Sequence, residues 1–481
     1  MKQKKVRLIY LIIPIFFILV ITIILFFMRY LNSNILITTG KEMKLEQSEY
    51  QLVDDENIKM EISENKLEKY DNKYEEISQE VLEEVKKENI NIHIDPTTGI
   101  KYVTYEDFEV YADGKHDDYE AIMKTHIYAN DNDLEVRAQN KEYHIFREDE
   151  YIPIPIKTNT NWNNATLVLH DENISAKKTK DYPLFQILSF EKEQTIRERN
   201  ILDEITINKQ TNNIPELSGY GNCVCMIYND NRKQFIRYGE NQNSGNSQQD
   251  IFKIDNKGNV LNEIQWDFDY ISRIVLIPIP KEELEIKNAN FITILPQEGR
   301  EQERGYYNRN IICYRSNTKI RNINHNLDKE ESLGGPYYGF LRVEKCSDVL
   351  LENCKLTAHK YKQASNYDLI IEYATDIEMN KVTQENLEDA NRWGITGTNY
   401  TKDIIYKNCK LNRVDAHSGV HNLTIENSIV GDKGITVVGS GELNIINTTI
   451  LSKQALINLR SDYGATWERK YKYQRLQYAT I

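Results

Sequence analysis

The chain has 481 residues, of which 40% are hydrophobic and 28% are charged, and its formal net charge at pH 7 is −13. It carries 31 Tyr and 13 Phe against 21 Gly and 10 Pro, a composition too aromatic for a disordered or low-complexity chain. The excess of 73 Asp and Glu over 60 Lys and Arg argues against a nucleic-acid partner, because phosphates would be repelled.

An uncharged apolar stretch extends from Leu8 to Met28. As a helix rising ~1.5 Å per residue it is about 30 Å long, the thickness of a bilayer's hydrocarbon core. Residues 1–7 contain three Lys and one Arg, whereas only Arg29 follows closely. The positive-inside rule therefore predicts a single-pass protein of the cell membrane, with a cytoplasmic tail over 1–7, a transmembrane helix over 8–28 and an extracytoplasmic remainder. A cleaved signal peptide is the alternative, but no small-x-small cleavage site follows.

Residues 29–95 are expected to form a helical or partly disordered stalk. Lys41 to Asp95 contain neither Gly nor Pro, and apolar residues recur at steps of three and four: Leu67, Tyr70, Tyr74, Ile77, Val81 and Val85. This spacing places one apolar stripe on a helix. The stripe is shorter than three heptads, so it does not indicate a coiled coil, and the oligomeric state stays open.

Residues 96–481 show an internal repeat of apolar alternation, Asn, a small residue and further apolar residues. The Asn positions are 353, 408, 427 and 447, and the segment 376–382 fits a middle coil between the first two. Such self-similarity is typical of a solenoid. A parallel β-helix is predicted, with regular coils over 318–459, because each turn buries its apolar face only by stacking. The Asn side chains would form a ladder, with Cys354 and Cys409 as small hydrophobic residues. The L-x-x-L-x-L spacing of a leucine-rich repeat is absent.

The start of this region carries a second signal in the segment 103–131. It contains Asp107, Phe108, Asp113, Gly114, Asp117 and Asp118, and a helical pattern follows from Tyr119. The segment resembles the opening of the pectate-lyase-like superfamily of right-handed β-helix proteins. The resemblance implies an all-β fold, a right-handed parallel β-helix solenoid closed by a short N-terminal capping helix. We expect Asp117 and Asp118 to accept backbone N–H bonds at that helix.

Residues 174–304 are more irregular and are expected to hold irregular or inserted coils. Within them, 255–279 resembles a hairpin-like insertion in β-helix proteins of bacterial surfaces and phage tail appendages. After Trp467 the repeat is lost, although similar superfamily members continue there with further coils. That resemblance implies that the C-terminus of the chain is truncated.

Candidate site residues lie just beyond equivalent strands, where β-helix enzymes commonly present their sites. The predicted catalytic residues are Asp415, His417, Arg392, His359 and Asp368. The predicted substrate-binding residues are Lys360, Tyr361, Trp393, Arg413, Arg460 and Asp462. Neighbouring rungs lie about 4.8 Å apart, so residues one or two rungs apart can share a site.

The triplet Asp415-Ala416-His417 resembles the D-P-H motif of mannuronan epimerases and alginate lyases that share this solenoid. The resemblance implies that His417 removes the proton α to a uronate carboxylate while a cation neutralises that carboxylate. A neutral imidazole is a suitable base, and an Arg can bind a carboxylate bidentately. Three alternatives stay open. Two of the carboxylates Asp368, Asp415 and Asp462 could instead form the acid pair of a glycoside hydrolase. His417 could be a turn residue that donates to the backbone, and Trp393 could be a core residue.

The sequence therefore predicts a membrane-anchored β-helix that binds and modifies an extracytoplasmic polysaccharide by elimination, epimerisation or hydrolysis. The close pair Cys223 and Cys225 forms a C-x-C rather than a metal or redox motif, and we expect no cofactor and no metal. A non-catalytic adhesin or structural binding module is the alternative. An inactive fragment is a third interpretation, based on the altered C-terminus.

Overall fold

The structure is a computed structural model, and the residues that it describes belong to one compact unit within 61–481. They are 77–85, 90–146, 152–172, 183–234, 246–295, 311–329, 339–357, 367–392, 394, 396–453, 455–459, 471–476 and 479–480. The predicted tail and transmembrane helix lie outside these ranges, and both stay predictions. Of the helices that the structure does describe, none has the length and apolar character needed to cross a bilayer.

The last part of the predicted stalk contributes to the folded unit. Residues 77–85 are helical, and Val81, Leu82 and Val85 belong to the main hydrophobic core. Glu84 on this helix pairs with Lys124, whose Nζ lies 2.9 Å from its carboxylate. The predicted apolar stripe therefore packs against the β-structured region at its C-terminal end.

The N-terminal cap consists of β1 (His93–Ile94), β2 (Lys101–Val103), a 3₁₀ turn (Tyr105–Phe108) and helix α2 (Tyr119–Asn132). Asp118 is fully buried, and its carboxylate accepts the backbone N–H groups of Tyr111, Ala112 and His144. Asp117 accepts the backbone N–H of Tyr119. The predicted capping helix and its backbone-accepting aspartates are confirmed, although Asp118 bonds to the preceding loop and to His144 rather than to its own helix.

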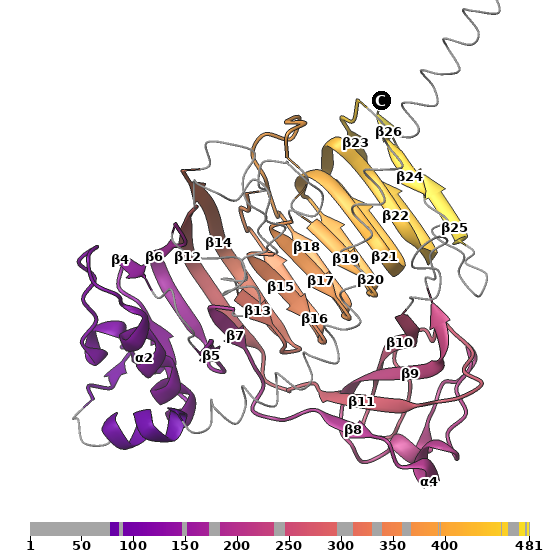
Figure 1. Ribbon diagram of the computed structural model, residues 1–481, viewed down its shortest axis with the longest axis horizontal. Helices are drawn as coiled ribbons and strands as arrows, with labels where there is room; N and C mark the ends of the chain where they lie inside the picture. Colours follow the sequence, from indigo (N-terminus) through magenta and orange to yellow (C-terminus); the bar gives the residue numbers. More distant parts are fainter. Residues whose placement is uncertain are drawn as a thin grey trace, which may run out of the picture. The chain divides into compact units, whose positions relative to one another are not determined.

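The large sheet contains 22 strands, and successive coils pair in parallel, so that each strand lies beside its equivalent one coil later (Figure 1). The first coils contain β3 (Glu135–Arg137), β4 (Glu142–Ile145), β5 (Ile154–Ile156), β6 (Thr160–His170), β7 (Phe185–Ile187) and β12 (Leu284–Ile294). The next coils have two main faces. One face consists of β13 (Ile311–Cys313), β15 (Leu341–Glu344), β17 (Leu369–Glu372) and β19 (Thr396–Asn399). The other face consists of β14 (Thr318–Asp328), β16 (Ser347–Glu352), β18 (Thr375–Asn380) and β20 (Lys402–Lys407). The last coils contain β21 (Lys410–Glu426), β22 (Ile429–Ile446), β23 (Thr448–Ile450), β24 (Ile457–Leu459), β25 (Tyr471–Leu476) and β26 (Ala479–Thr480).

This arrangement is a large parallel β-structure of the β-helix type. Inward residues such as Val349, Ile377 and Ile404 occupy one register position on successive coils, and each is at most 2% exposed. Their stacking forms a continuous core, which explains why no single coil is stable alone. The right-handed sense of the coil stays a prediction.

Asn residues turn the chain at equivalent corners of the coils. Asn353, Asn408, Asn427 and Asn447 all have positive φ, between 47° and 56°, a conformation that Asn tolerates better than most residues. Asn447 Nδ2 donates to Asn427 Oδ1 at 2.6 Å. Asn408 donates to Asn380 Oδ1 at 2.9 Å, so the middle coil predicted at 376–382 does lie between Asn353 and Asn408. The predicted ladder is confirmed between Asn427 and Asn447, whereas the corner of the middle coil is Lys381 and the side chain of Asn427 donates to Glu426.

The cysteines behave as small hydrophobic residues. All six are buried and free of disulfides, and both Cys354 and Cys409 are 1% exposed. Burial raises the pKa of each of these two thiols to about 12. They are therefore neutral core residues, as the sequence predicts.

Outside the coils, between β7 and β12, the chain forms a separate four-stranded antiparallel sheet in the order β10-β9-β11-β8. Its elements are β8 (Gln194–Ile196), α4 (Arg199–Leu202), a 3₁₀ turn (Pro215–Leu217), β9 (Cys223–Gln234), β10 (Asn246–Ile254) and β11 (Arg273–Pro278). It has a hydrophobic core of its own around Ile227, Phe252 and Ile274. We call residues 194–278 the inserted sheet.

Candidate functional site

Strand β21 presents a polar row on one face and an apolar row on the other. Val414 and Ala416 belong to the main core, so the alternating residues Arg413 and Asp415 project from the opposite face. In the register of the coils, Asp415 lies opposite Gly397 on β19. A polar cluster is therefore built over the outer face of a rigid strand.

Three side chains converge on one oxygen of Asp415. Arg413 Nη2 lies 2.9 Å from Asp415 Oδ2, the hydroxyl of Tyr367 donates to the same oxygen, and His417 Nδ1 lies 3.6 Å from it. The Asp415 side chain is completely buried, while those of Arg413 and His417 are 8% and 13% exposed. We call Tyr367, Arg413, Asp415 and His417 the Asp415 cluster.

Gly397 explains how Tyr367 reaches this position. A Cβ atom on Gly397 would lie only 3.0 Å from two atoms of the Tyr367 ring. Real Cβ atoms seldom approach so closely, so the absent side chain leaves the space across β19 that the ring fills. A residue 48 positions before Asp415 is thereby brought against its carboxylate.

The electrostatics of the cluster keep Asp415 ionised. Burial by itself raises the pKa of Asp415, but the charge of Arg413, the nearby His417 and the Tyr367 hydroxyl outweigh it and lower the pKa below its ordinary value. Oδ1 of the carboxylate is buried and has no hydrogen-bond partner among the described residues. The cluster thus holds a negative charge with one acceptor atom still unsatisfied.

A second polar group adjoins β21 at Asn412, which is fully buried. Its backbone N–H donates to Gln384 Oε1 at 3.2 Å and its Nδ2 donates to the carbonyl oxygen of Arg392 at 3.4 Å. Nearby, burial and the charge of Arg413 lower the pKa of Lys433. The charged side chain of Arg392 pairs with Asp389, so Lys433 is the cation added to the surroundings of the Asp415 cluster.

The structure brings together some of the predicted site residues and leaves others apart. Asp415, His417 and Arg413 lie in one cluster, and Arg392 adjoins it through Asn412 with its own Nε 3.2 Å from Asp389. Six of the predicted residues lie outside the described ranges: His359, Lys360, Tyr361, Trp393, Arg460 and Asp462. Their roles stay predictions.

Asp368 has a different environment. It is fully buried, and its carboxylate lies 2.8 Å from His325 Nδ1 and accepts the backbone N–H of Thr357. The His325 ring stacks on Phe340 with centroids 3.8 Å apart. Because Asp368 is bound to groups inside the coil, it is not included in the candidate site.

Sequence reasoning missed Tyr367, Asn412 and Lys433. Tyr367 lies two residues before β17, and only the stacking of coils shows that its ring packs across Gly397. The signal available in the sequence was the pair Gly394 and Gly397, because glycines leave space for neighbouring side chains. A Cβ on Gly394 would lie 3.1 Å from Arg413, just as one on Gly397 would lie 3.0 Å from the Tyr367 ring. In the part of the chain that the structure describes, no three His, Cys, Asp or Glu residues form a metal-binding group.

Comparison with known proteins gives no family assignment by sequence. No model of a protein family matches the chain, and no curated protein matches it. Solved structures do match the chain, each at a TM-score below 0.5. The tailspike gp61 of Pseudomonas phage phi297 matches at 11% identity and a TM-score of 0.46, over 73% of this chain and 64% of that chain.

Two further structures are similar. The gp54 tailspike of Acinetobacter baumannii bacteriophage AP22, solved with A. baumannii capsular saccharide, matches at 10% identity and a TM-score of 0.40, over 76% of this chain and 62% of that chain. The Streptococcus pneumoniae surface protein and adhesin PfbA matches at 11% identity and a TM-score of 0.38, over 74% of this chain and 82% of that chain. The chain spans less than two thirds of the length of the two tailspikes.

Proposed function

We propose that this chain binds a uronate-containing polysaccharide at the Asp415 cluster and removes the proton α to a uronate carboxylate. The observation that carries the proposal is the convergence of Arg413, Tyr367 and His417 on one oxygen of the buried Asp415. A cation, a base and a hydroxyl donor within one cluster are the groups that elimination or epimerisation of a uronate requires.

Arg413 has the role of binding the substrate carboxylate. Its planar guanidinium can donate two parallel hydrogen bonds to a carboxylate, and this neutralisation makes the α C–H more acidic. Asp415 positions Arg413 and stays ionised because its pKa is lowered. Lys433 adds positive charge near Arg413.

His417 has the role of base. Its neutral imidazole accepts the α proton, and the electron pair of the broken C–H bond moves into the substrate as an enolate. In elimination, the pair then forms a C=C bond while the glycosidic C–O bond breaks, and the Tyr367 hydroxyl protonates the leaving oxygen. In epimerisation, Tyr367 returns a proton to the α carbon from the opposite face. In both cases solvent then reprotonates the tyrosine and takes the α proton from His417, which restores both groups.

The test uses the full chain in mild detergent with alginate, polygalacturonate, hyaluronan and a neutral glucan. Unsaturated uronates, uronate epimer ratios and new reducing ends are measured together. His417→Ala, Tyr367→Phe and Arg413→Gln are each expected to lower kcat/KM by about 10²–10⁴-fold, the usual contribution of a positioned acid or base. His116→Ala is the matched control, because His116 is an exposed histidine of the N-terminal cap.

The possible results separate the reaction classes. New reducing ends without unsaturated product would indicate hydrolysis and overturn the assignment of His417 as the base. Full activity in His417→Ala would do the same. The low exposure of the cluster favours one alternative, a non-catalytic glycan-binding adhesin. It predicts retained binding of one polymer without any product.

A further inference from the structure

A row of polar side chains crosses the last coils where the inserted sheet contacts them. Lys402 on β20, His421 on β21 and Ser440 on β22 occupy one register position on successive coils. Each of the three contacts a residue of the inserted sheet. The row therefore joins side chains from three coils to side chains of a separate structural element.

Within this row, a serine, a histidine and a carboxylate are linked through the two nitrogens of one ring. His421 Nδ1 lies 2.9 Å from Ser440 Oγ, and His421 Nε2 lies 3.4 Å from Glu263 Oε2. The imidazole side chain is 6% exposed, and its Nε2 has no hydrogen-bond partner among the described residues. Ser440 is half-buried and Glu263 is exposed. A nucleophile beside a base that a third group orients is the pattern of an activated hydroxyl.

Glycines on both sides of Ser440 allow this close approach. A Cβ on Gly441 would lie 2.8 Å from Cε1 and 2.9 Å from Nδ1 of His421, and Gly441 has a φ of 76°. A Cβ on Gly439 would overlap the carbonyl oxygen of Val420. Larger residues do not fit at either position, so the segment 439–441 holds the serine hydroxyl against the imidazole.

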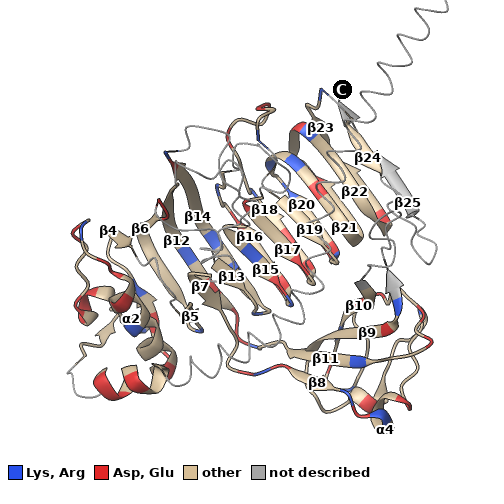
Figure 2. Ribbon diagram, in the orientation of Figure 1, with Lys and Arg blue, Asp and Glu red and all other residues tan. Residues whose placement is uncertain are grey.

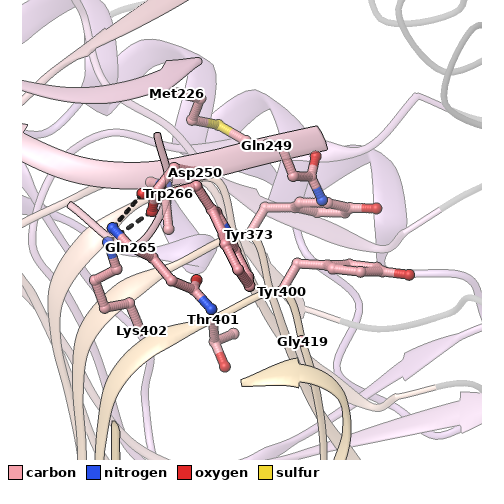
Figure 3. Close-up of a pocket in the computed structure, with 11 residues that line it drawn as sticks. Met226, Gln249, Asp250, Gln265, Trp266, Tyr373, Tyr400, Thr401, Lys402 and Gly419 are labelled. Atoms are coloured by element: carbon pink, nitrogen blue, oxygen red, sulfur yellow. Dashed lines mark hydrogen bonds and ion pairs between the residues drawn. The ribbon is translucent and has the colours of Figure 1, made fainter. Parts of the chain in front are cut away.

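Gln265 supplies a hydrogen-bond donor at the same hydroxyl. Its Nε2 donates to Ser440 Oγ at 2.5 Å, and its backbone N–H donates to Asp250 Oδ2 at 2.6 Å, which fixes the residue. Gln265 also lines a cleft between the inserted sheet and the coils, with Trp266 and Tyr400 (Figure 3). An amide donor beside Oγ can also bond an oxyanion that forms on a carbon attached to Oγ.

The charges around the row favour an uncharged substrate group. Lys402 Nζ lies 2.6 Å from Asp250 Oδ1, and both side chains are 1% exposed, so this ammonium group is already neutralised. Glu263 and Glu442, two residues after Ser440, are exposed carboxylates. They repel a phosphate or sulfate ester, whereas a carboxylic ester carries no charge. Because Ser440 is half-buried, a small acyl group fits best.

We propose that Ser440, His421 and Glu263 hydrolyse a small acyl ester of a carbohydrate hydroxyl. Ser440 is the nucleophile, His421 is the base, Glu263 positions the imidazole, and Gln265 bonds the oxyanion. The choice of a carbohydrate ester rests on the proposed function, whereas the hydrolysis of an ester does not.

The first step transfers the acyl group to the protein. Ser440 Oγ attacks the carbonyl carbon and its proton passes to His421 Nδ1, while the carbonyl oxygen becomes an oxyanion bonded by Gln265 Nε2. The bond from that carbon to the sugar oxygen then breaks, and the sugar oxygen takes the proton from Nδ1. Ser440 is left with the acyl group as an ester.

The second step uses water. Its oxygen attacks the acyl carbon and gives a proton to His421 Nδ1, the bond between that carbon and Ser440 Oγ breaks, and Oγ takes the proton. The free carboxylic acid leaves. In both steps the N–H at Nε2 donates to Glu263, which stabilises the imidazolium. Such hydrogen bonds are often long before substrate binds and shorten in the complex.

The test uses the full chain in mild detergent with p-nitrophenyl acetate and with O-acetylated polygalacturonate. Released p-nitrophenolate and acetate are measured, and an acid quench followed by peptide mass spectrometry locates the acetyl group. We expect that group on Ser440, and a loss of at least about 10²-fold in kcat/KM in Ser440→Ala and in His421→Gln. Ser189→Ala is the matched control, because Ser189 is a half-buried serine that accepts the backbone N–H of Glu191.

Variants of Glu263 separate positioning from a purely structural contact. Glu263→Gln is expected to lower kcat by at least about tenfold with KM unchanged, because the imidazolium loses its counter-charge. Glu263→Asp is expected to restore part of kcat. Loss of activity together with detachment of the inserted sheet, seen by limited proteolysis, would assign Glu263 a docking role and overturn its positioning role.

The remaining outcomes decide the assignment. Absence of ester hydrolysis by the native chain with both probes, native activity in Ser440→Ala, or an acetyl group trapped at another residue would overturn it. Trapping uses the native chain and therefore does not depend on the folding of a variant. Acetate release that persists while no lyase or epimerase product forms would reject the proposed reaction and support this second site.

Discussion

At the scale of single residues, the N-terminal cap contains a histidine with an unusual environment. His126 on α2 is fully buried, and its Nε2 lies 3.2 Å from the hydroxyl of Tyr105. That hydroxyl accepts the indole N–H of Trp162 at 2.8 Å, so its own proton is directed to His126. Burial lowers the pKa of His126 to about 3, because the charged form loses its hydration. The folded chain therefore holds a neutral imidazole.

This environment predicts acid-sensitive stability. A histidine in the unfolded chain titrates near pH 6.5, so below that pH the unfolded state binds a proton at His126 and the folded state does not. The contribution of neutral His126 to the free energy of unfolding is fully present above about pH 6.5 and is lost as the pH falls toward 3. At pH 5 the free energy of unfolding is expected to be about 2 kcal/mol lower than at pH 7. Urea unfolding at both pH values measures this difference.

The control for this prediction is a residue that does not titrate. His126→Gln is expected to lose most of the difference between pH 5 and pH 7, whereas His116→Ala keeps it, since His116 is exposed. An unchanged pH dependence in His126→Gln would place the acid-sensitive group elsewhere.

At the scale of elements, the inserted sheet is attached to the coils by polar contacts rather than by a shared apolar core. Its core residues form a cluster separate from that of the coils. Lys253 Nζ lies 2.8 Å from Asp348 and 3.1 Å from Asp376, on two successive coils, and Asn262 donates to Thr375. Figure 2 shows acidic and basic residues on neighbouring strands of the coils as well. The docking of the inserted sheet therefore depends on paired charges.

Lys402 is the most buried of these docking groups, and its loss predicts a local effect. Lys402→Met leaves the carboxylate of Asp250 buried without its cation, which costs about 3–5 kcal/mol when a buried pair is broken. Because the two cores are separate, the inserted sheet is expected to detach and become protease-sensitive before the coils unfold. Limited proteolysis followed by mass spectrometry identifies the cleaved segment.

Two further variants check that this effect comes from the buried charge. Lys402→Met with Asp250→Asn is expected to regain most of the protection, because no uncompensated charge remains. Lys355→Met breaks a pair with Glu385 that is largely exposed and is expected to change stability by less than about 1 kcal/mol. Equal proteolysis in the Lys402 and Lys355 variants would contradict the docking role.

At the scale of the whole molecule, the apolar stretch 8–28 predicts the cellular location of the chain. We propose that it anchors the chain in the cell membrane with residues 1–7 in the cytoplasm and the coils outside. The full chain is expected in the membrane fraction, resistant to extraction by salt, and accessible to protease on intact cells. Deletion of 1–28 is expected to abolish membrane association.

A second variant tests the orientation. Replacement of the four basic residues in 1–7 by Gln removes the charge bias and is expected to lower the fraction of chains with the coils outside. Native chain in the soluble fraction, or protease resistance on intact cells with cleavage after lysis, would refute the proposed location.

The candidate site was predictable where its residues share one strand. The sequence grouped Arg413, Asp415 and His417 but placed them just beyond a strand, whereas all three lie within β21, whose period sets Arg413 and Asp415 on one face. Tyr367 was not predictable, because its position depends on the coil that separates it from Asp415 and on the missing side chain of Gly397. Asp368 follows Tyr367 directly, yet its carboxylate bonds to His325 in the interior.

The sequence by itself determined the parallel coils and the corner Asn residues, because both depend on local chemistry repeated at a regular interval, whereas the capping helix was implied by a family resemblance. Only the tertiary structure decided the antiparallel form of the inserted sheet and its contacts with the coils. These features join residues 152 positions apart, as in the Lys402 and Asp250 pair, and no local period links such positions. The stacking of coils and the docking of the inserted sheet brought these residues together. Burial stabilises such contacts between distant segments, and local sequence patterns do not reveal them.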